Sequence, residues 1–457
     1  MAPEDIRSDL APAWVAGGER SLRTERPRSK SQRARDPSSD WNPRSIYALA
    51  VLTLISAFNY LDRSLLGLAL PSIKREMHLS DTVLGLVSGL AFVLFYSTLG
   101  VPIAWAADRW NRRNILATGL VFWSLMTAFT SLVKNGWQLA TARFLMGAGE
   151  ACGTAPSTSM LSDLFDKGHR PLALAIFQTA ISISFIFFYP IAGWICDHRG
   201  WREAFVAAGA PGFPLALLLI LSVREPARGA ADRGVTALDP HTIRDTLRFL
   251  AGSASYRFIL LGVVFMGAVV QSGAAWNTMF IVRVHHWNIT RVASVAGPTQ
   301  GVFGAVGSLL GGALVNNLGR RDGRWRLWVP AIACLLVAPA TVVFLLGDRT
   351  AVWITGMAFS YLLAILHLGP IYAACLSVAK VRMRAVATSL ALLSAGLFGQ
   401  VFGPLLVGRL NDVLLGRLGQ MGIRYSMLVV PCGAVVAAVS FFAAAQHVER
   451  DMQRALA

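Results

Sequence analysis

Long apolar stretches alternate with short polar loops along almost the whole chain. A helix needs roughly 20 predominantly apolar residues to cross a bilayer. The pattern therefore predicts an all-α membrane protein with twelve transmembrane helices. The stretches lie near residues 46–68, 82–106, 114–133, 137–162, 171–196, 203–222, 257–283, 293–316, 327–347, 351–379, 385–413 and 425–446.

Polar segments divide this series of helices. The N-terminal segment is rich in Arg, Ser and Pro and holds few apolar residues, which is typical of a disordered tail. A second polar segment separates the sixth crossing from the seventh. The predicted organisation is a disordered cytoplasmic tail at 1–44, a six-helix bundle at 45–222, a cytoplasmic linker at 223–256, a second six-helix bundle at 257–447 and a cytoplasmic tail at 448–457.

The linker contains one candidate helix. Asp239 is a suitable N-cap, and Pro240 suits the first turn of a helix. Ile243, Leu247 and Leu250 then share one helix face. This pattern favours a short amphipathic helix on the cytoplasmic membrane surface, or an extension of the seventh crossing.

The net charge fits a membrane protein better than a nucleic-acid-binding protein. The 457 residues are 54% hydrophobic and 15% charged, and 42 Lys and Arg against 25 Asp and Glu give a charge of +17. The basic residues lie in loops between apolar stretches, where they direct membrane topology. More of them fall on the side that holds both chain ends. We therefore expect a multi-pass protein of a bacterial inner membrane with cytoplasmic termini and no nucleic-acid partner.

The two halves share a repeated loop. The loop after the second crossing reads Asp108-Arg109-Trp110-Asn111-Arg112-Arg113, and the loop after the eighth reads Asn316-Asn317-Leu318-Gly319-Arg320-Arg321. Four residues before each loop stand Ala104 and Gly312. Two parallel repeats around a central cavity are a known plan of secondary transporters.

This loop resembles the signature of the major facilitator superfamily, Gly-x3-Asp-Arg-x-Gly-Arg-Arg. The first copy departs from it at Ala104 and Asn111, and the second has Asn316 in place of the acid. The resemblance covers nearly all of residues 45–447 and implies two pseudo-symmetric six-helix bundles with alternating access. It also implies a conformational gate formed by Asp108, Arg109, Arg112, Arg113, Gly312, Asn316, Gly319, Arg320 and Arg321. A purely topological role for the arginines is the alternative.

Three further motifs resemble the spinster-like branch of this superfamily. They are Asn59-Tyr60-Leu61-Asp62-Arg63, Arg143-Phe144-Leu145-Met146-Gly147-Ala148-Gly149-Glu150, and Gly200-Trp201-Arg202. Members of that branch include lysolipid and sphingolipid-phosphate carriers, which implies a lysolipid-like or other small-molecule substrate. The anion:cation symporter branch shares the opening motif and is the rival.

Four ionisable residues lie inside predicted crossings, namely Asp62, Arg63, Arg143 and Glu150. Helix rise places Asp62 and Arg143 at a similar depth, so that these two residues can meet, and Glu150 nearer the middle. Buried charges of this kind usually mark transport pathways, although a helix-locking ion-pair network is the alternative. We expect Glu150 and Asp62 to serve proton coupling. We expect the substrate to contact Asn59, Tyr60, Arg63, Arg143, Gln271, Gln300 and His367, although helix packing is the alternative for the polar residues of the second half.

The sequence thus predicts a monomeric, proton-coupled secondary transporter of an amphiphilic or organic anion. Export of hydrophobic drug-like compounds is the alternative within transporters. A polytopic membrane enzyme would need a catalytic cluster, and no His, Glu and Asp group with ligand spacing is present; a non-transporting sensor is a further alternative. The five widely spaced cysteines follow no disulfide or metal pattern, so we expect no metal site and no cofactor.

The loop motif generates a test of the gate. Asp108→Asn should slow turnover several-fold and leave substrate affinity nearly unchanged, because the motif acts on the closure of the cytoplasmic side rather than on the ligand. Transport rates and equilibrium binding, measured on the same purified protein, separate the two effects. Normal turnover combined with lost binding contradicts a gating role.

Overall fold

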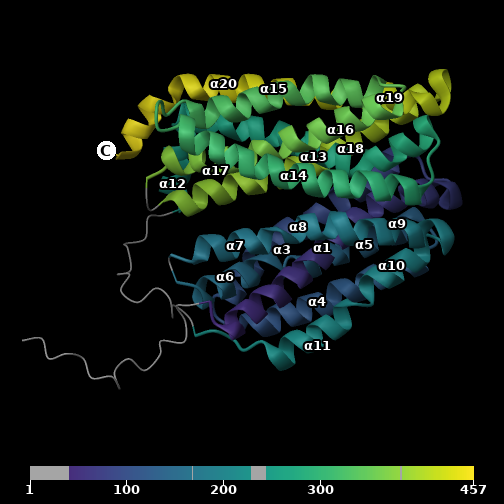
Figure 1. Cartoon of the computed structure of the whole chain (residues 1–457), viewed down its shortest axis with the longest axis horizontal. Helices are drawn as coiled ribbons and strands as arrows, with labels where there is room; N and C mark the ends of the chain where they lie inside the picture. Colours follow the sequence, from purple (N-terminus) through teal and green to yellow (C-terminus); the bar gives the residue numbers. More distant parts are fainter. Residues whose placement is uncertain (1–40, 167, 228–242, 381–382, 457) are drawn as a thin grey trace, which may run out of the picture. The chain divides into compact units, whose positions relative to one another are not determined.

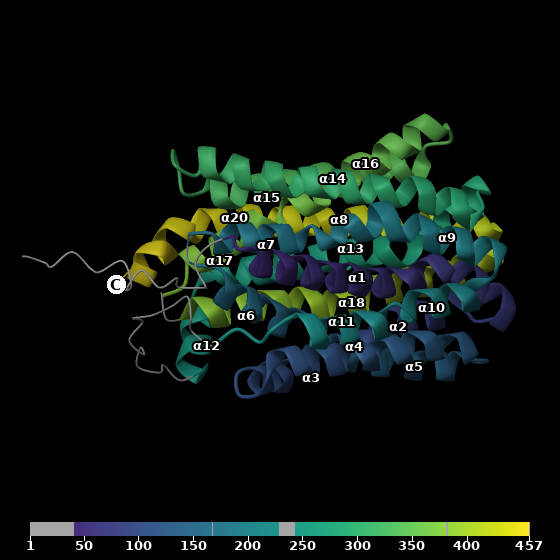
Figure 2. The ribbon, with the colours of Figure 1, turned by 60° about the horizontal axis from the view of Figure 1, so that its bottom comes forward.

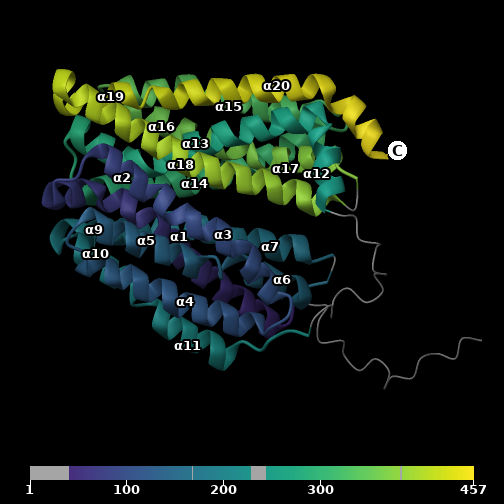
Figure 3. The same ribbon diagram turned by 180° about the vertical axis from the view of Figure 1, so that it is seen from behind.

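The computed structural model describes residues 41–166, 168–227, 243–380 and 383–456, and all regular structure in these ranges is helical. The predicted N-terminal tail up to residue 40 lies outside the described residues. So do Asp239 and Pro240, although a helix does follow them at Ile243–Ala251. Figures 1 and 3 show the molecule from opposite sides, with the helices of the first half below those of the second.

The first half contains crossings one to six. Its helices are α1 (Pro43–Met77), α2 (Asp81–Ser88), α3 (Leu90–Ala107), α4 (Arg112–Phe129), η1 (Thr130–Leu132), α5 (Gly136–Glu150), α6 (Thr154–Leu164), α7 (Arg170–Gln178), α8 (Ala180–Ile183), the π-helical η2 (Ser184–Phe188), α9 (Tyr189–His198), α10 (Trp201–Gly209) and α11 (Gly212–Ser222).

The second half contains the linker helix and crossings seven to twelve. Its helices are α12 (Ile243–Ala251), α13 (Ala254–His285), α14 (Ile289–Leu318), α15 (Trp325–Leu346), α16 (Thr350–Leu366), α17 (Leu368–Ser377), α18 (Arg384–Leu418), η4 (Gly419–Met421), α19 (Gly422–Ser426) and α20 (Val429–Leu456). Figure 2 shows α1 and α18 between α3–α5 on one side and α14–α16 on the other.

The prediction of twelve crossings is confirmed. By length and composition alone, 10 stretches of the described residues can span a membrane, and one of them, Val386–Leu456, holds both α18 and α20. These stretches account for eleven crossings, and the one left out is the fourth crossing along the chain. A turn at 151–153 divides it into α5 and α6, each of which is too short to count as a membrane span by itself. Because of this break, a criterion of helix length and hydropathy does not detect the crossing that carries Arg143 and Glu150.

Side-chain caps fix where several crossings begin. An Asn or Ser side chain accepts a hydrogen bond from a backbone N–H in the first turn, which satisfies a donor that the helix leaves free. The capping residues are Asn42 of α1, Ser80 of α2, Asn111 of α4, Asn135 of α5, Ser253 of α13 and Asn288 of α14. Each lies in a polar loop directly before an apolar stretch.

Helix α1 begins and α20 ends at one end of the bundle, here called the inner end; the opposite end is the outer end. The halves meet where α2 packs on α18, where α14 packs on α9 and η2, and where α1 packs on α13. Two glycines show how close these contacts are. A Cβ on Gly85 would lie 2.4 Å from the carbonyl oxygen of Pro404, and one on Gly297 would lie 2.5 Å from that of Phe185.

An ion-pair cluster joins the halves at the outer end. Arg283 of α13 donates to both carboxylate oxygens of Asp81, at 2.7 and 2.9 Å, and Lys74 of α1 donates to Asp81 at 2.5 Å. The side chains of Asp81 and Arg283 are only 3% and 9% exposed. The three residues, called the outer latch below, bury a charge cluster across the boundary between the halves.

A reciprocal pair of carboxylates supports the outer latch. Asp412 of α18 accepts from the backbone N–H groups of Asp81 and Thr82 at the start of α2, at 2.9 and 2.8 Å. In the other direction, Asp197 of α9 accepts from the hydroxyl of Thr290 at the start of α14, at 2.9 Å. Each half thus places an acid at the N-terminus of a helix in the other half, where the helix dipole favours negative charge.

The outer latch predicts a change in conformation when Asp81 loses its charge. Removing one partner of a buried ion pair costs about 3–5 kcal/mol. Asn keeps the size and some hydrogen bonds, so in Asp81→Asn we expect the ratio of outer-open to outer-closed molecules to rise at least about tenfold, about 1.4 kcal/mol. Spin labels on Arg199→Cys and Arg417→Cys, in a cysteine-free background, report the distance between the outer ends of the halves.

The matched control is Asp348→Asn, which removes a carboxylate at the same end. Asp348 pairs with Arg424 at 3.0 Å within the second half, and its own side chain is 83% exposed. This change should leave the label distances as in the parent protein. Equal distance distributions in Asp81→Asn and Asp348→Asn would show that the outer latch does not hold the halves together.

Candidate functional site

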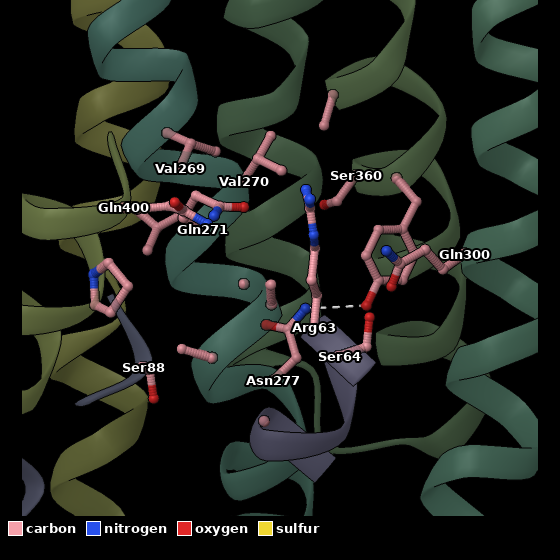
Figure 4. Close-up of a pocket in the computed structure, with 18 of the residues that line it drawn as sticks. Arg63, Ser64, Ser88, Val269, Val270, Gln271, Asn277, Gln300, Ser360 and Gln400 are labelled. Atoms are coloured by element: carbon pink, nitrogen blue, oxygen red, sulfur yellow. Dashed lines mark hydrogen bonds between the residues drawn. The ribbon is translucent and has the colours of Figure 1, made fainter. Parts of the chain in front are cut away.

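A cavity of about 260 Å³ lies between the two halves. Among its described lining residues only Arg63 and Arg143 carry a charge, and both belong to the first half. The second half supplies the amides Gln271, Asn277, Gln300 and Gln400. Figure 4 shows the Arg63 side chain between Gln271 and Gln400 on one side and Gln300 and Ser360 on the other. The rest of the lining is mainly apolar.

Arg63 is held by one carboxylate and by aromatic rings. Its Nε donates to Oε2 of Glu150 at 2.6 Å. The guanidinium carbon lies 4.5 Å from the ring centre of Tyr96, 5.4 Å from Phe92 and 5.9 Å from Tyr60. Ring faces attract cations, so these contacts fix the guanidinium at the cavity wall. Tyr60, a predicted substrate contact, lines the cavity as well.

Glu150 is fully buried and lies outside the cavity lining. It is the last residue of α5, directly before the turn that breaks the fourth crossing. The predicted contact residue Asn59, also buried and outside the lining, lies beside it. Arg63 links Glu150 to the cavity, because it contacts Glu150 and also lines the cavity.

Arg143 lines the cavity but is 2% exposed. Its Nη1 donates to the backbone carbonyl oxygen of Asp62 at 3.4 Å, and its guanidinium lies 5.2 Å from the ring centre of Phe92. The expected meeting of Asp62 and Arg143 thus occurs through the backbone. The Nε of Arg143 has no hydrogen-bond partner in the described protein, and no carboxylate there forms an ion pair with this arginine.

The second half contributes some predicted contacts and not others. Gln271 and Gln300 line the cavity as expected, whereas His367 lies buried outside the lining, near the α16–α17 junction, with its ring 6.5 Å from that of Phe441. The cavity also includes Tyr361, whose hydroxyl accepts from the Asn277 amide at 3.1 Å. Sequence reasoning missed Tyr361, because a tyrosine in an apolar helix carries no positional signal.

The predicted gate residues lie at the inner end in two different settings. In the first half, Arg112 is buried and bonds Asp163 and Glu225, while Asp108 and Arg109 are exposed. Arg113 donates to the backbone carbonyls of Ile220 and Val223. In the second half, Arg321 is exposed, and a separate cleft is lined by Gly312, Asn316, Gly319 and Arg320.

The helix order, the loop repeat and the cavity between two halves agree with a sequence comparison. The model of the Major Facilitator Superfamily matches residues 52–404. The chain belongs to the major facilitator superfamily. As a member of this superfamily it is a multi-pass membrane transporter, and its twelve crossings are those of the superfamily fold.

The relatives of this superfamily member confirm the resemblance to the spinster-like branch. A protein of Mycolicibacterium smegmatis named MFS-type efflux pump is 30% identical over 421 residues, which are 91% of this chain and 96% of that protein. Protein spinster homolog 3 of Danio rerio is 26% identical over 434 residues, 90% of this chain and 87% of that protein.

A solved structure is similar over nearly the same length. It is a bacterial homolog of the human lysosomal transporter Spinster in an inward-facing, unoccupied conformation. The two chains are 27% identical, with a TM-score of 0.80, and the match covers 90% of this chain and 99% of the other. The fold of this chain, with its outer ends in contact, is therefore similar to a transporter solved in the inward-facing state.

Proposed function

We propose that the chain transports an amphiphilic or organic anion by alternating access, coupled to protons. The observation that carries the proposal is Arg143, a buried guanidinium that lines the cavity and forms no ion pair with a carboxylate of the described residues. Asp62 and Glu150 act on this guanidinium only at a distance, and its Nε has no acceptor among the described residues. A buried guanidinium that lacks a direct carboxylate acceptor is costly, so the cavity favours a negatively charged ligand. Guanidinium groups bind carboxylate and phosphate in a bidentate manner.

Charge balance links the ligand to a proton. With Asp62 and Glu150 both ionised, two acids offset Arg63 and Arg143. Protonation of Glu150 frees Arg63 and leaves one positive charge in excess, which an anion at the cavity wall offsets. Because Arg63 contacts Glu150 and also lines the cavity, substrate and carboxylate compete for the same guanidinium. The proton and the anion therefore favour each other's binding.

The size of the cavity bears on the substrate. Small-molecule sites commonly measure roughly 300–1,000 Å³, and this cavity, at about 260 Å³, is slightly smaller than that range. It suits a compact anionic group, such as a small organic acid or the head of a lysolipid-like molecule. The apolar side chains of Phe92, Phe185 and Val269 provide a surface for an attached hydrocarbon portion.

We infer that the described conformation is the inward-facing state. The outer latch joins the halves at the outer end, and the similar solved structure is inward-facing. The inner end, where α1 begins and α20 ends, is then cytoplasmic, as the excess of basic residues in its loops indicates. We expect the protein to act as a monomer in a bacterial inner membrane, since each chain holds a complete cavity.

Export of hydrophobic drug-like compounds is the second candidate. It is favoured by the mycobacterial relative, whose name describes an efflux pump and whose 30% identity extends over 91% of this chain. The mainly apolar lining suits such compounds as well. The two candidates differ in their need for the guanidinium groups, because a neutral or cationic drug gains nothing from them.

Substitution of the cavity arginines tests the charge of the substrate. Hydrogen bonds to charged groups contribute about 1.5–3 kcal/mol, so Arg143→Ala or Arg63→Ala should weaken anion binding by about 10- to 100-fold. Lysine should rescue only in part, because it lacks the planar guanidinium. Binding is measured on purified protein with a panel of lysolipids and organic acids, chosen first by thermal shift.

The control is Arg349→Ala, which removes an exposed arginine at the outer end and should bind as the parent does. A folded Arg63→Ala and a folded Arg143→Ala that both bind and transport normally would exclude an anionic substrate. Drug-like export would then become the leading function.

Glu150→Gln tests the coupling separately. Gln keeps the shape of the side chain and can still accept from Arg63, but it cannot take up a proton. We expect pH-gradient-driven transport to be abolished in proteoliposomes, while exchange of substrate at equal pH continues. Glu449→Gln, at an exposed ion pair with Arg324, is the control and should retain both activities. Gradient-driven transport at the parental rate in Glu150→Gln would rule out this residue as the proton carrier.

A further inference from the structure

The loop repeat places Arg112 and Arg320 at equivalent positions in the two halves. In the first half, Arg112 is 2% exposed and is neutralised by two acids. Its Nη1 donates to Asp163 at 2.5 Å and its Nε donates to Glu225 at 2.7 Å. The site around this arginine in the first half is thus an anion-binding site that the chain fills with its own carboxylates.

The equivalent site in the second half is an open cleft of about 560 Å³ at the inner end. It is lined by residues of α14, α15, α17 and α18, and its described lining contains three arginines and no acid. None of the three forms an ion pair with a carboxylate in the part of the chain that the structure describes. The charged and amide lining residues are Asn316, Arg320, Arg326 and Arg384.

The cleft lacks carboxylates because its own elements supply none. Asp163 lies near the end of the fourth crossing, whereas the corresponding end of the tenth crossing, in α17, offers Leu376 and Ser377 to the cleft. An acid that could take the place of Glu225 is Glu449, but it pairs with Arg324, which is outside the lining. The described residues that line the cleft therefore bring three arginines together without a carboxylate.

Helix α18 adds a further source of positive potential. It begins at Arg384, a lining residue, and no side chain caps its first turn. The helix dipole at such an N-terminus favours an anion. This feature acts together with three guanidinium groups that form no ion pair within the described residues, of which Arg320 and Arg384 belong to exposed residues.

We propose that the cleft binds the phosphate group of an anionic ligand at the inner face of the membrane. Three guanidinium groups around one cleft suit a phosphate, which accepts bidentate hydrogen bonds and can carry more than one negative charge. The phosphate can belong to the head of an acidic phospholipid or to a soluble phosphate ester. The site is at the inner ends of membrane helices, where basic pockets bind acidic lipid heads.

This site is separate from the transport cavity, since the two linings share no residue. Binding of a phosphate there would tie α14 and α18 together at the inner end of the second half. Both helices also form the contacts between the halves, through Gly297 of α14 and through Asp412 of α18. The ligand is thus expected to change the stability of the second half rather than the affinity of the cavity for substrate.

The test uses the full-length protein purified in a neutral detergent. The probes are short-chain phosphatidylglycerol, short-chain phosphatidylcholine, glycerol 3-phosphate and inorganic phosphate, and the readout is the melting temperature. Binding to the folded state should raise the melting temperature of the parent protein by at least about 2 °C. The effect should shrink as salt is added, because part of the site is exposed and ions screen it.

The test variant is Arg320→Gln combined with Arg326→Gln, and the matched control is Arg321→Gln. Arg321 is the exposed neighbour of Arg320 and lies outside the lining, so its loss alters net charge without altering the cleft. A shift caused by phosphatidylglycerol alone, kept in the control and lost in the double variant, identifies a lipid head. A shift with the same residue dependence caused by glycerol 3-phosphate or phosphate identifies a soluble ligand.

Two results overturn the proposal. One is the absence of a shift with every phosphate-bearing probe in the parent protein. The other is a shift of equal size in the double variant and in Arg321→Gln, which shows only a general attraction to positive charge. If the double variant melts without a cooperative transition, Arg326→Gln alone is compared with Arg321→Gln by the same two criteria.

Discussion

Every charge buried in this apolar bundle needs a compensating charge, and the two functional regions of the molecule differ in how they meet that need. At the outer end, Asp81 receives two cations, Lys74 and Arg283, and the helix N-termini nearby receive Asp412 and Asp197. A fully compensated cluster has nothing to gain from a ligand, so it serves as a contact between the halves.

The cavity is compensated less completely. Glu150 forms an ion pair with Arg63, whereas Arg143 contacts a backbone carbonyl, the Met146 sulfur and an aromatic ring and forms no ion pair within the described residues. The Arg143 guanidinium, whose charge is not paired directly, lies between the two halves, where apolar side chains exclude water. Because attraction between charges strengthens as water is excluded, a small imbalance there has a large effect on what binds. In the function proposed above, Arg63 and Arg143 bind the anion and Glu150 takes up the proton.

Much of this molecule could be predicted from the sequence, but the pairing of its charges could not. Apolar length located all twelve crossings, and the rarity of buried charge singled out Arg63, Arg143 and Glu150. Depth along a helix follows from residue number, yet the direction in which a side chain points depends on helix packing. For this reason the ion pair between Arg63 and Glu150 was not foreseen, although the similar depth of Asp62 and Arg143 was.

The outer latch shows a second limit. Lys74 and Arg283 look like ordinary loop cations, because their shared partner is distant in the sequence and belongs to the other half. The repeated spacing Gly193-x3-Asp197 and Gly408-x3-Asp412 at the ends of the fifth and eleventh crossings was the available signal. This spacing reveals a contact between the halves only once the structure shows each acid at the start of a helix in the opposite half.

The glycine contacts between the halves have a consequence for motion. At Gly85 and Gly297 the nearest atom of the opposite half is a backbone carbonyl oxygen, of Pro404 and Phe185 respectively, so backbone meets backbone at both points. Interlocked side chains must separate and change rotamer before two helices can slide, whereas smooth backbone surfaces can move past one another with little repacking. The two seams that contain these glycines, α2 on α18 and α14 on η2, are related by the internal repeat. The halves can therefore rotate about these two contacts, and the charged clusters determine which conformation is the most stable.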